Sequence, residues 1–271
     1  MDELHLKKEK LISRIQSPGK IAVAFSAGVD STFLLKICSE ALKENAVALT
    51  CVSPVNPERE SDEAADFCRE KGIKQIIITP DLLSLDAFVK NPPDRCYHCK
   101  KALFTALKEA AEKEGIHTVA DGSNASDTGD YRPGMRALDE LGIISPLKEA
   151  GLTKEDIRIL SKEEGLPTWS KPSYACLATR IAYGEAVTAE KLRIIEKAEQ
   201  KLFDMGFTQA RVRMHGSLAR IEVEKDKLAL LAGENISAEI NSYLRSLGFH
   251  YVTADLAGYE TGSMNRDLSV M

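Results

Sequence analysis

The stretch IAVAFSAGVDST, residues 21–32, gives the strongest indication of the fold. The apolar run Ile21–Phe25 is followed at once by small and hydroxyl-bearing residues, and then by a helical pattern with Phe33, Leu34 and Ile37 on its apolar side. A buried strand that passes through a short turn into a helix is typical of the first unit of a parallel, helix-covered sheet.

The same rhythm recurs along the first half of the chain. The predicted strands are 46–52, 76–79 and 116–120, and the predicted helices are 2–17, 30–44, 58–71 and 98–114. This order predicts an α/β domain with a parallel sheet covered by helices on both faces. Ligands of such sheets bind beyond the carboxyl ends of the strands, so the loops that follow the strands are the candidate functional segments.

The pattern changes in the last third of the chain. A helix begins at the capping-box sequence Thr153-Lys-Glu-Asp156 and is broken by Pro167. After a stretch without periodicity, the expected elements are a helix at 188–203, strands at 207–215 and 218–224, a helix at 235–247 and a strand at 249–255. The predicted organisation is a first domain over 1–168, an active-site loop or linker over 169–185, and a smaller α+β domain over 186–271.

Composition and charge exclude several classes of protein. The 271 residues are 44% hydrophobic and 28% charged, which is typical of a globular protein rather than a disordered one. A net charge of -5 argues against general electrostatic binding of nucleic acid. No apolar run approaches the length of a membrane span, and the charged first residues lack a signal sequence, so a cytoplasmic protein is expected.

The loop after the first predicted strand is a candidate phosphate site. Its small residues let the backbone amides close around an anion at the start of a helix, and its serines offer further donors. The candidate residues are Ser26, Ala27, Gly28, Val29, Asp30 and Ser31. An ordinary strand-to-helix turn, with Asp30 or Ser31 as the helix cap, is the alternative.

A second polar loop follows the predicted strand 116–120. Gly122 would permit close approach to a base, and Ser123 and Asn124 are candidate nucleotide contacts. Asp127, together with Asp30, is a candidate ligand of Mg²⁺. A polar turn or helix cap explains the same residues without any ligand.

Six cysteines fall into two groups. Cys38, Cys51 and Cys68 lie in helical or strand patterns where a thiol packs as a small hydrophobic residue. Cys96 and Cys99 form a CxxC at a helix start, where thiolates are favoured, and a metal site would need a further ligand. Cys176 has cationic neighbours in the loop and is a candidate for that role. A redox dithiol, chance cysteines, or a zinc site that includes His98 remain alternatives.

Arg211 and Arg213 alternate with apolar residues in a predicted strand and therefore share one face. Two guanidiniums on one face suit the phosphate of a mononucleotide. A solvated face with salt bridges is the alternative.

The motif at residues 26–31 resembles the SGGxDS signature of the PP-loop ATP pyrophosphatases, with Ala27 in place of a family glycine. That substitution would strain any backbone conformation that requires glycine. The wider set of motifs resembles the LarE group of PP-loop sulfur transferases. The segments that carry this resemblance are SAGVDST (26–32), PPDRCYHC (92–99), DGSNASDTGDYRPG (121–134), KPSYACLATR (171–180) and YETGSMN (259–265).

The resemblance implies an adenine nucleotide α-hydrolase-like fold and an enzyme that uses ATP and Mg²⁺. It implies that a carboxylate of a pyridinium biscarboxylic acid mononucleotide is adenylylated and then converted to a thiocarboxylate, a step in making the nickel-pincer nucleotide of lactate racemase. The substrate site implied is Arg180, Glu199, Arg211 and Arg213. A homo-oligomer, by family resemblance a hexamer, is expected, and nucleic acid and membrane are not expected partners.

Members of the LarE group differ in the number of cysteines that they use. Single-cysteine members sacrifice the sulfur of the residue that aligns with Cys176. The additional CxxC here implies a 4Fe-4S cluster held by Cys96, Cys99 and Cys176, which delivers sulfur taken from sulfide or a persulfide. A PP-loop tRNA thiolase with the same cluster is the alternative enzyme, and an iron-sulfur or nucleotide-sensing module is the alternative without catalysis.

Overall fold

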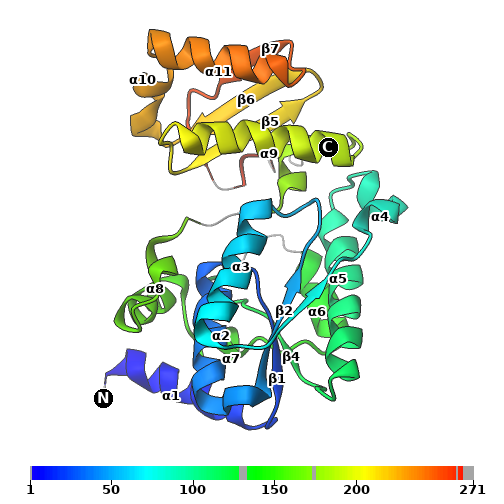
Figure 1. Ribbon diagram of the computed structural model, residues 1–271, viewed down its shortest axis with the longest axis vertical. Helices are drawn as coiled ribbons and strands as arrows, with labels where there is room; N and C mark the ends of the chain where they lie inside the picture. Colours follow the sequence, from blue (N-terminus) through cyan, green and yellow to red (C-terminus); the bar gives the residue numbers. More distant parts are fainter. Residues whose placement is uncertain (1, 128–132, 173–174, 261, 265–271) are drawn as a thin grey trace. The chain divides into compact units, whose positions relative to one another are not determined.

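The computed structural model describes residues 2–127, 133–172, 175–260 and 262–264, with the side chain of Pro133 left aside. The chain forms two compact units (Figure 1). The first comprises residues 1–82 and 94–174, and the second comprises 83–93 and 175–271. The predicted organisation kept 83–93 in the first domain, because nothing in the sequence of that short segment shows that it packs with the last third of the chain.

The first unit contains the expected parallel sheet. Its strands are β1 (Ile21–Ala24), β2 (Ala46–Cys51), β3 (Gln75–Ile78) and β4 (Val119–Ala120). All pair in parallel, in the order β3-β2-β1-β4. The order reverses direction between β1 and β4, so the loops after these two strands flank the position where α/β sheets bind ligands. The predicted α/β fold is confirmed.

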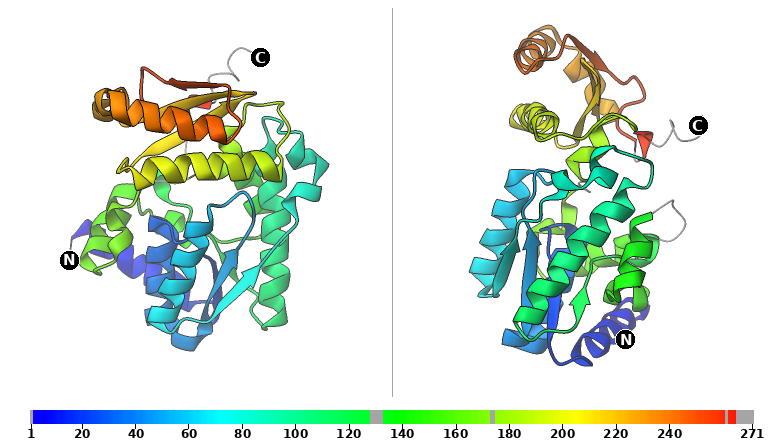
Figure 2. Two further views of the ribbon diagram at one scale, coloured as in Figure 1. Left: turned by 45° about the horizontal axis from the view of Figure 1, so that its top comes forward. Right: turned by 90° about the vertical axis from the view of Figure 1, so that its right-hand side faces the viewer.

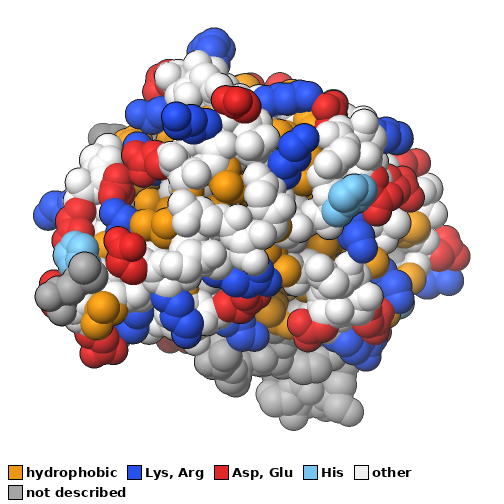
Figure 3. All heavy atoms as spheres, turned by 90° about the horizontal axis from the view of Figure 1, so that it is seen from below, with side chains coloured by type: hydrophobic (Ala, Val, Ile, Leu, Met, Phe, Trp, Pro, Cys, Tyr) orange, Lys and Arg blue, Asp and Glu red, His pale blue; other side chains and the backbone are white. Residues whose placement is uncertain are grey.

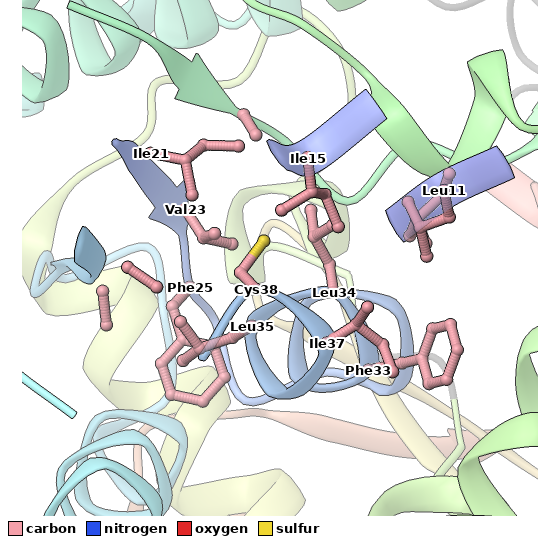
Figure 4. Close-up of a cluster of buried hydrophobic side chains, with 14 of the residues drawn as sticks. Leu11, Ile15, Ile21, Val23, Phe25, Phe33, Leu34, Leu35, Ile37 and Cys38 are labelled. Atoms are coloured by element: carbon pink, nitrogen blue, oxygen red, sulfur yellow. The ribbon is translucent and has the colours of Figure 1, made fainter. Parts of the chain in front are cut away.

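Alternation along β1 directs successive side chains to two helical layers (Figure 2). Ile21 and Val23 face one core, and Ala22 faces the other. The helices on the first face are α1 (Glu3–Gln16), α2 (Val29–Leu42), α3 (Glu58–Lys71) and α8 (Lys154–Glu163). The other face is covered by α5 (Arg95–Lys113) and α6 (Pro133–Leu141). Figure 4 shows the first core, in which side chains of α1 and α2 meet β1.

The second unit is the predicted α+β part. Its sheet has the order β5-β6-β7, formed by β5 (Ala210–His215), β6 (Leu218–Val223) and β7 (Tyr251–Ala254). Strands β5 and β6 are antiparallel, whereas β6 and β7 are parallel. Helices α9 (Ala189–Asp204) and α11 (Glu234–Ser246) lie along this sheet (Figure 2).

Short helical elements complete the two units. They are α4 (Asp86–Val89), α7 (Pro146–Glu149), α10 (Leu228–Leu231) and the 3-10 turns η1 (Lys43–Asn45), η2 (Leu82–Ser84), η3 (Ala125–Asp127), η4 (Pro167–Ser170), η5 (Leu177–Arg180) and η6 (Lys225–Lys227). The capping box expected at the start of α8 is present, with Thr153 and Asp156 each bonded to the other's backbone N–H.

The surface carries charges of both signs. On the face drawn in Figure 3, lysine and arginine side chains stand among aspartate and glutamate side chains. Within the described ranges, no helix combines the length and the apolar character that crossing a membrane requires.

Candidate functional site

The loop after β1 is organised by its own serines. The Ser31 hydroxyl donates to the Gly28 carbonyl at 3.3 Å and accepts from the Ser26 backbone N–H at 3.4 Å. Gly28 occupies the cap position of α2 and supplies no side-chain cap. The backbone N–H groups at the start of α2 therefore face a turn of small residues. The predicted phosphate site requires this arrangement, because those N–H groups would bind the anion.

Ala27 lies in the left-handed region of the backbone, with φ of +51°. It is 3% exposed, so the methyl group is packed into the interior as well as strained. A left-handed conformation favours glycine, because a Cβ atom approaches the following carbonyl oxygen. The position where the sequence departs from the PP-loop signature is thus a position where glycine would fit better.

Replacing Ala27 with glycine is expected to stabilise the protein by about 0.5–1 kcal/mol, because relief of left-handed strain exceeds the added freedom of the unfolded chain. Urea unfolding measures the change. Ala106→Gly in the middle of α5 is the matched control, and it is expected to destabilise by about 1 kcal/mol because its helical backbone carries no such strain. Equal losses in both variants would contradict a strained Ala27.

The loop after β4 approaches the same helix start. A Cβ atom at Gly122 would lie 3.2 Å from the Ser31 backbone N and 3.4 Å from its Cα. The sequence predicts that Gly122 admits a base, and in this structure it admits the backbone of α2. Asp121, 5% exposed, holds the loop by accepting from the Ser145 hydroxyl at 2.6 Å and from the Ser123 hydroxyl.

The carboxylate of Asp30 is largely shielded from water. Burial raises the pKa of Asp30 above its ordinary value, while the nearby Lys154 opposes this shift and Asp127 adds to it. The Lys154 ammonium contacts Asp30 Oδ2 at 2.5 Å. Among the described residues, buried Oδ1 of Asp30 has no hydrogen-bond partner. An oxygen left in this state, near a second carboxylate, fits a divalent cation.

Lys171 is a residue of this loop region that the sequence did not single out. Its ammonium donates to the carbonyl of strained Ala27 at 3.0 Å and pairs with Glu63 of α3. Arg158 of α8 in turn donates to the carbonyls of Trp169 and Lys171. Within the first unit, residues 169–171 are therefore bonded to α8 and to the loop after β1. A lysine in a KP sequence gives no sign of such a long-range bond.

The structure buries two of the three cysteines that the sequence predicts to pack as small hydrophobic residues. Cys38 and Cys68 are buried, and burial raises the pKa of both thiols, that of Cys68 to about 11. Cys96 is exposed, and Cys99 and Cys176 are half-buried. Cys51, expected to be buried in a strand, is half-buried because it is the last residue of β2.

Cys96 and Cys99 stand three residues apart in the first turn of α5, so they project from one side of the helix. Cys176 belongs to the second unit and caps η5. Exposed or half-exposed thiols suit metal ligands better than the buried pair does. Within the part of the chain that the structure describes, no three His, Cys, Asp or Glu side chains form a metal-binding group.

Arg180 holds the turn at Cys176 through hydrogen bonds to the backbone. The guanidinium donates to the carbonyl of Ala175 at 2.6 Å and to that of Cys176 at 3.1 Å. Its other side meets Glu199 of α9 in two bonds, at 2.8 and 3.0 Å, with both side chains buried. Burial alone would lower the pKa of Arg180, but the charge and hydrogen bonds of Glu199 raise it above its ordinary value.

Arg211 and Arg213 share a face of β5, as the alternation predicts. Arg213 pairs with Glu222 of β6 at 2.8 Å, and Ser263 bonds to both side chains. Arg211 lies over the ring of Tyr259 and is 1% exposed. Burial and the positive charge of Arg180 lower the pKa of Arg211.

Among the described residues, this buried group of the second unit has an excess of positive charge. Three guanidiniums, those of Arg180, Arg211 and Arg213, accompany two carboxylates, those of Glu199 and Glu222. A buried net charge is costly unless an anion balances it. Glu199, which the resemblance assigns to the substrate site, pairs with Arg180. The carboxylate of Glu222 was not predicted, because it lies on the neighbouring strand.

Comparison with known proteins gives a match to a family and to nearly full-length relatives. Residues 6–106 match the model of the NAD synthase family. The chain is 37% identical over 266 residues to an uncharacterized protein of Synechocystis, covering 98% of this chain and 99% of that one.

A second relative has a named activity. The pyridinium-3,5-bisthiocarboxylic acid mononucleotide synthase of Lactiplantibacillus plantarum is 36% identical over 270 residues, covering 99% of this chain and 97% of its own length. The argininosuccinate synthase of Haloarcula marismortui is more distant, at 28% identity over 159 residues, 55% of this chain and 38% of that one.

Proposed function

The chain belongs to the LarE family of ATP-using PP-loop enzymes, and we propose that it converts a pyridinium biscarboxylic acid mononucleotide to its thiocarboxylate. The observation that carries the proposal is the similarity to the pyridinium-3,5-bisthiocarboxylic acid mononucleotide synthase along almost the whole of both chains. A match that includes both units supports a common substrate as well as a common activation chemistry.

The first unit would activate the substrate. A carboxylate oxygen attacks the α-phosphorus of ATP, the bond to the β-phosphate oxygen breaks, and pyrophosphate leaves. The amides at the start of α2 and the hydroxyls of Ser26 and Ser31 would hold the phosphates. Asp30 and Asp127 would hold Mg²⁺, which neutralises the phosphate oxygens and orients them for this displacement.

The second step replaces oxygen by sulfur. A sulfur nucleophile attacks the acyl carbon of the adenylate, and AMP leaves with the oxygen that formed the mixed anhydride. Cys96, Cys99 and Cys176 would supply three thiolates to a 4Fe-4S cluster, which when bound carries the sulfide for this attack. Arg180 would hold the Cys176 turn in place through the two carbonyls to which it donates.

The second unit would bind the substrate phosphate. The excess of one positive charge in the Arg180, Arg211 and Arg213 group supports this assignment, since guanidiniums bind phosphate and an anion offsets that charge. A bound phosphate would favour the charged form of Arg211, whose pKa is lowered by burial and by the like charge of Arg180.

Pyrophosphate release tests the activation step. The protein is incubated with ATP, Mg²⁺ and the pyridinium biscarboxylic acid mononucleotide, and pyrophosphate is measured with and without that substrate. The proposal predicts release only with the substrate present. In a further incubation tRNA replaces the mononucleotide, and release that depends on tRNA would assign a tRNA thiolase. ATP binding without pyrophosphate release in any of these incubations would assign a sensing module.

Replacing Lys171 with methionine is expected to weaken binding of a non-hydrolysable ATP analogue by about tenfold, because a charge-assisted bond to the Ala27 carbonyl is lost. Titration calorimetry measures the affinity. Lys162→Met removes an exposed lysine that lies over the ring of Trp169, and it should leave the affinity unchanged. Equal affinities in the two variants would show that Lys171 does not support the nucleotide loop.

A further inference from the structure

Arg220 of β6 is an arginine of the second unit with no role in the proposed function. It stands directly opposite Arg213 in the antiparallel pairing of β5 and β6, so both side chains lie on the same face of the sheet. Like charges in directly opposed positions destabilise a sheet unless a counter-ion balances them. Glu222 accepts from Nη2 of Arg220 at 3.2 Å and from Nη2 of Arg213 at 2.8 Å. One carboxylate is therefore shared by two guanidiniums.

Most N–H donors of Arg220 have no acceptor among the described residues. An arginine side chain offers donors on Nε, Nη1 and Nη2. In the described part of the chain only Nη2 donates, to Glu222 and, at 3.7 Å, to the sulfur of Met264. Nε is buried and has no hydrogen-bond partner there. Buried donors in native proteins nearly always have a partner, so Arg220 calls for an acceptor that these residues do not supply.

Arg220 is also the most accessible of the three arginines on this face. Its side chain is 28% exposed, whereas Arg211 and Arg213 are 1% and 5% exposed. An anion that arrives from the solvent therefore meets Arg220 before it meets the other two. A guanidinium with unused donors in this position suits a phosphate, because charge-assisted hydrogen bonds between arginine and phosphate are strong.

A carboxylate of the chain itself stands beside the unused donor. Oδ2 of Asp255, the residue after β7, lies 3.6 Å from Nε of Arg220, which is within ion-pair range but too long for a hydrogen bond. Its other oxygen, Oδ1, accepts from the Ala257 N–H at 3.0 Å. Asp255 therefore attracts Arg220 without satisfying its donor, and its negative charge opposes a second anion at the same guanidinium.

We propose that Arg220 is a substrate-binding residue that contacts the phosphate of the mononucleotide, and that Asp255 competes with this phosphate. The inference rests on the proposed phosphate site of the second unit. A phosphate gains the hydrogen bonds that Asp255 does not make, because its oxygens can approach the donors of Arg220 more closely than the carboxylate does.

Two substitutions should change the affinity for the pyridinium biscarboxylic acid mononucleotide in opposite directions. Arg220→Gln should weaken binding about tenfold, the effect expected for a lost hydrogen bond to a charged group. Asp255→Asn keeps an acceptor for the Ala257 N–H but removes the competing charge, so it should strengthen binding about threefold. Titration calorimetry measures both affinities. Arg193→Gln, at an exposed arginine of α9, is the matched control and should leave the affinity unchanged.

The corresponding nucleoside, which lacks the phosphate, separates phosphate binding from a structural role. Glu222 keeps its bonds from Arg213 in Arg220→Gln, so this variant should fold and bind the nucleoside as wild type does. Equal weakening for nucleoside and mononucleotide, or no weakening for either, would overturn the role of Arg220. An Asp255→Asn variant that binds the mononucleotide no more tightly than wild type would overturn the competition.

Arginine modification decides the inference independently of the proposed substrate. Wild-type protein is treated with phenylglyoxal in the presence and absence of inorganic phosphate, and mass spectrometry locates the modified arginines. Phosphate should protect Arg220 and leave Arg193 equally reactive. An unprotected Arg220 would overturn the inference. A protected Arg220 in a protein that binds no mononucleotide would support the phosphate contact and overturn the proposed substrate.

Discussion

Replacing Cys99 with alanine is expected to reduce the iron content of anaerobically reconstituted protein from about four atoms per chain to well under one, because two remaining thiolates do not hold the cluster. The broad visible absorption should disappear with the iron. Product formation should fall from many turnovers to at most one per chain, since Cys176 could still give up its own sulfur. Iron analysis and product counting on one sample measure both effects.

Cys68→Ala is the matched control for this experiment. Its thiol is buried in α3, and burial raises its pKa to about 11, which makes it a poor metal ligand. The control should retain iron and turnover. A Cys99→Ala variant that keeps its full iron content would contradict the cluster assignment, and loss of the elements of hydrogen sulfide from Cys176 in wild-type protein would identify the sacrificial route.

Replacing Arg180 with methionine is expected to destabilise the protein by about 3–5 kcal/mol, because it leaves the buried carboxylate of Glu199 without its partner. The same change removes the donor that holds the carbonyls of Ala175 and Cys176. Urea unfolding measures the loss. The double variant Arg180→Met/Glu199→Gln should recover most of it, since the neutral amide still accepts from the Val212 N–H.

The pH dependence of the Arg180→Met loss has a defined sign. In wild type, burial alone would raise the pKa of Glu199, but Arg180 outweighs burial and holds this pKa below its ordinary value of 4.5. Glu199 therefore contributes stability at neutral pH that is lost as the pH falls below 4.5. Without Arg180, burial should raise the pKa, so the variant's deficit should shrink on acidification. A deficit independent of pH would contradict a buried ion pair.

Local patterns predicted most of the secondary structure. The alternation in β5 and the capping box of α8 depend on residues close in sequence, and both are present. The predicted strand 116–120 is shorter because only Val119 and Ala120 pair with β1. The division of the chain was harder to predict, because Asn91 reaches the second unit through contacts with residues 90 positions away.

The candidate site rests on motifs, and the long-range pairs around it were not predicted. The loop at Ser26–Ser31 and the arginines of β5 were proposed from residue type and spacing, and their roles stay predictions. The bonds of Lys171 to Ala27, Lys154 to Asp30 and Glu222 to Arg213 join segments whose meeting depends on the tertiary fold. Parts of the quoted motifs, at residues 128–132, 173–174, 261 and 265, lie outside the described residues.

Mass spectrometry of the small-molecule product shows whether this protein exchanges oxygen for sulfur on the mononucleotide. Reconstituted protein is incubated with ATP, Mg²⁺, a sulfide source and the pyridinium biscarboxylic acid mononucleotide. We expect a product heavier by the difference between one sulfur and one oxygen atom, formed repeatedly by each chain and accompanied by equal amounts of AMP and pyrophosphate. An unchanged mononucleotide, with sulfur found instead in added tRNA, would contradict the proposed function.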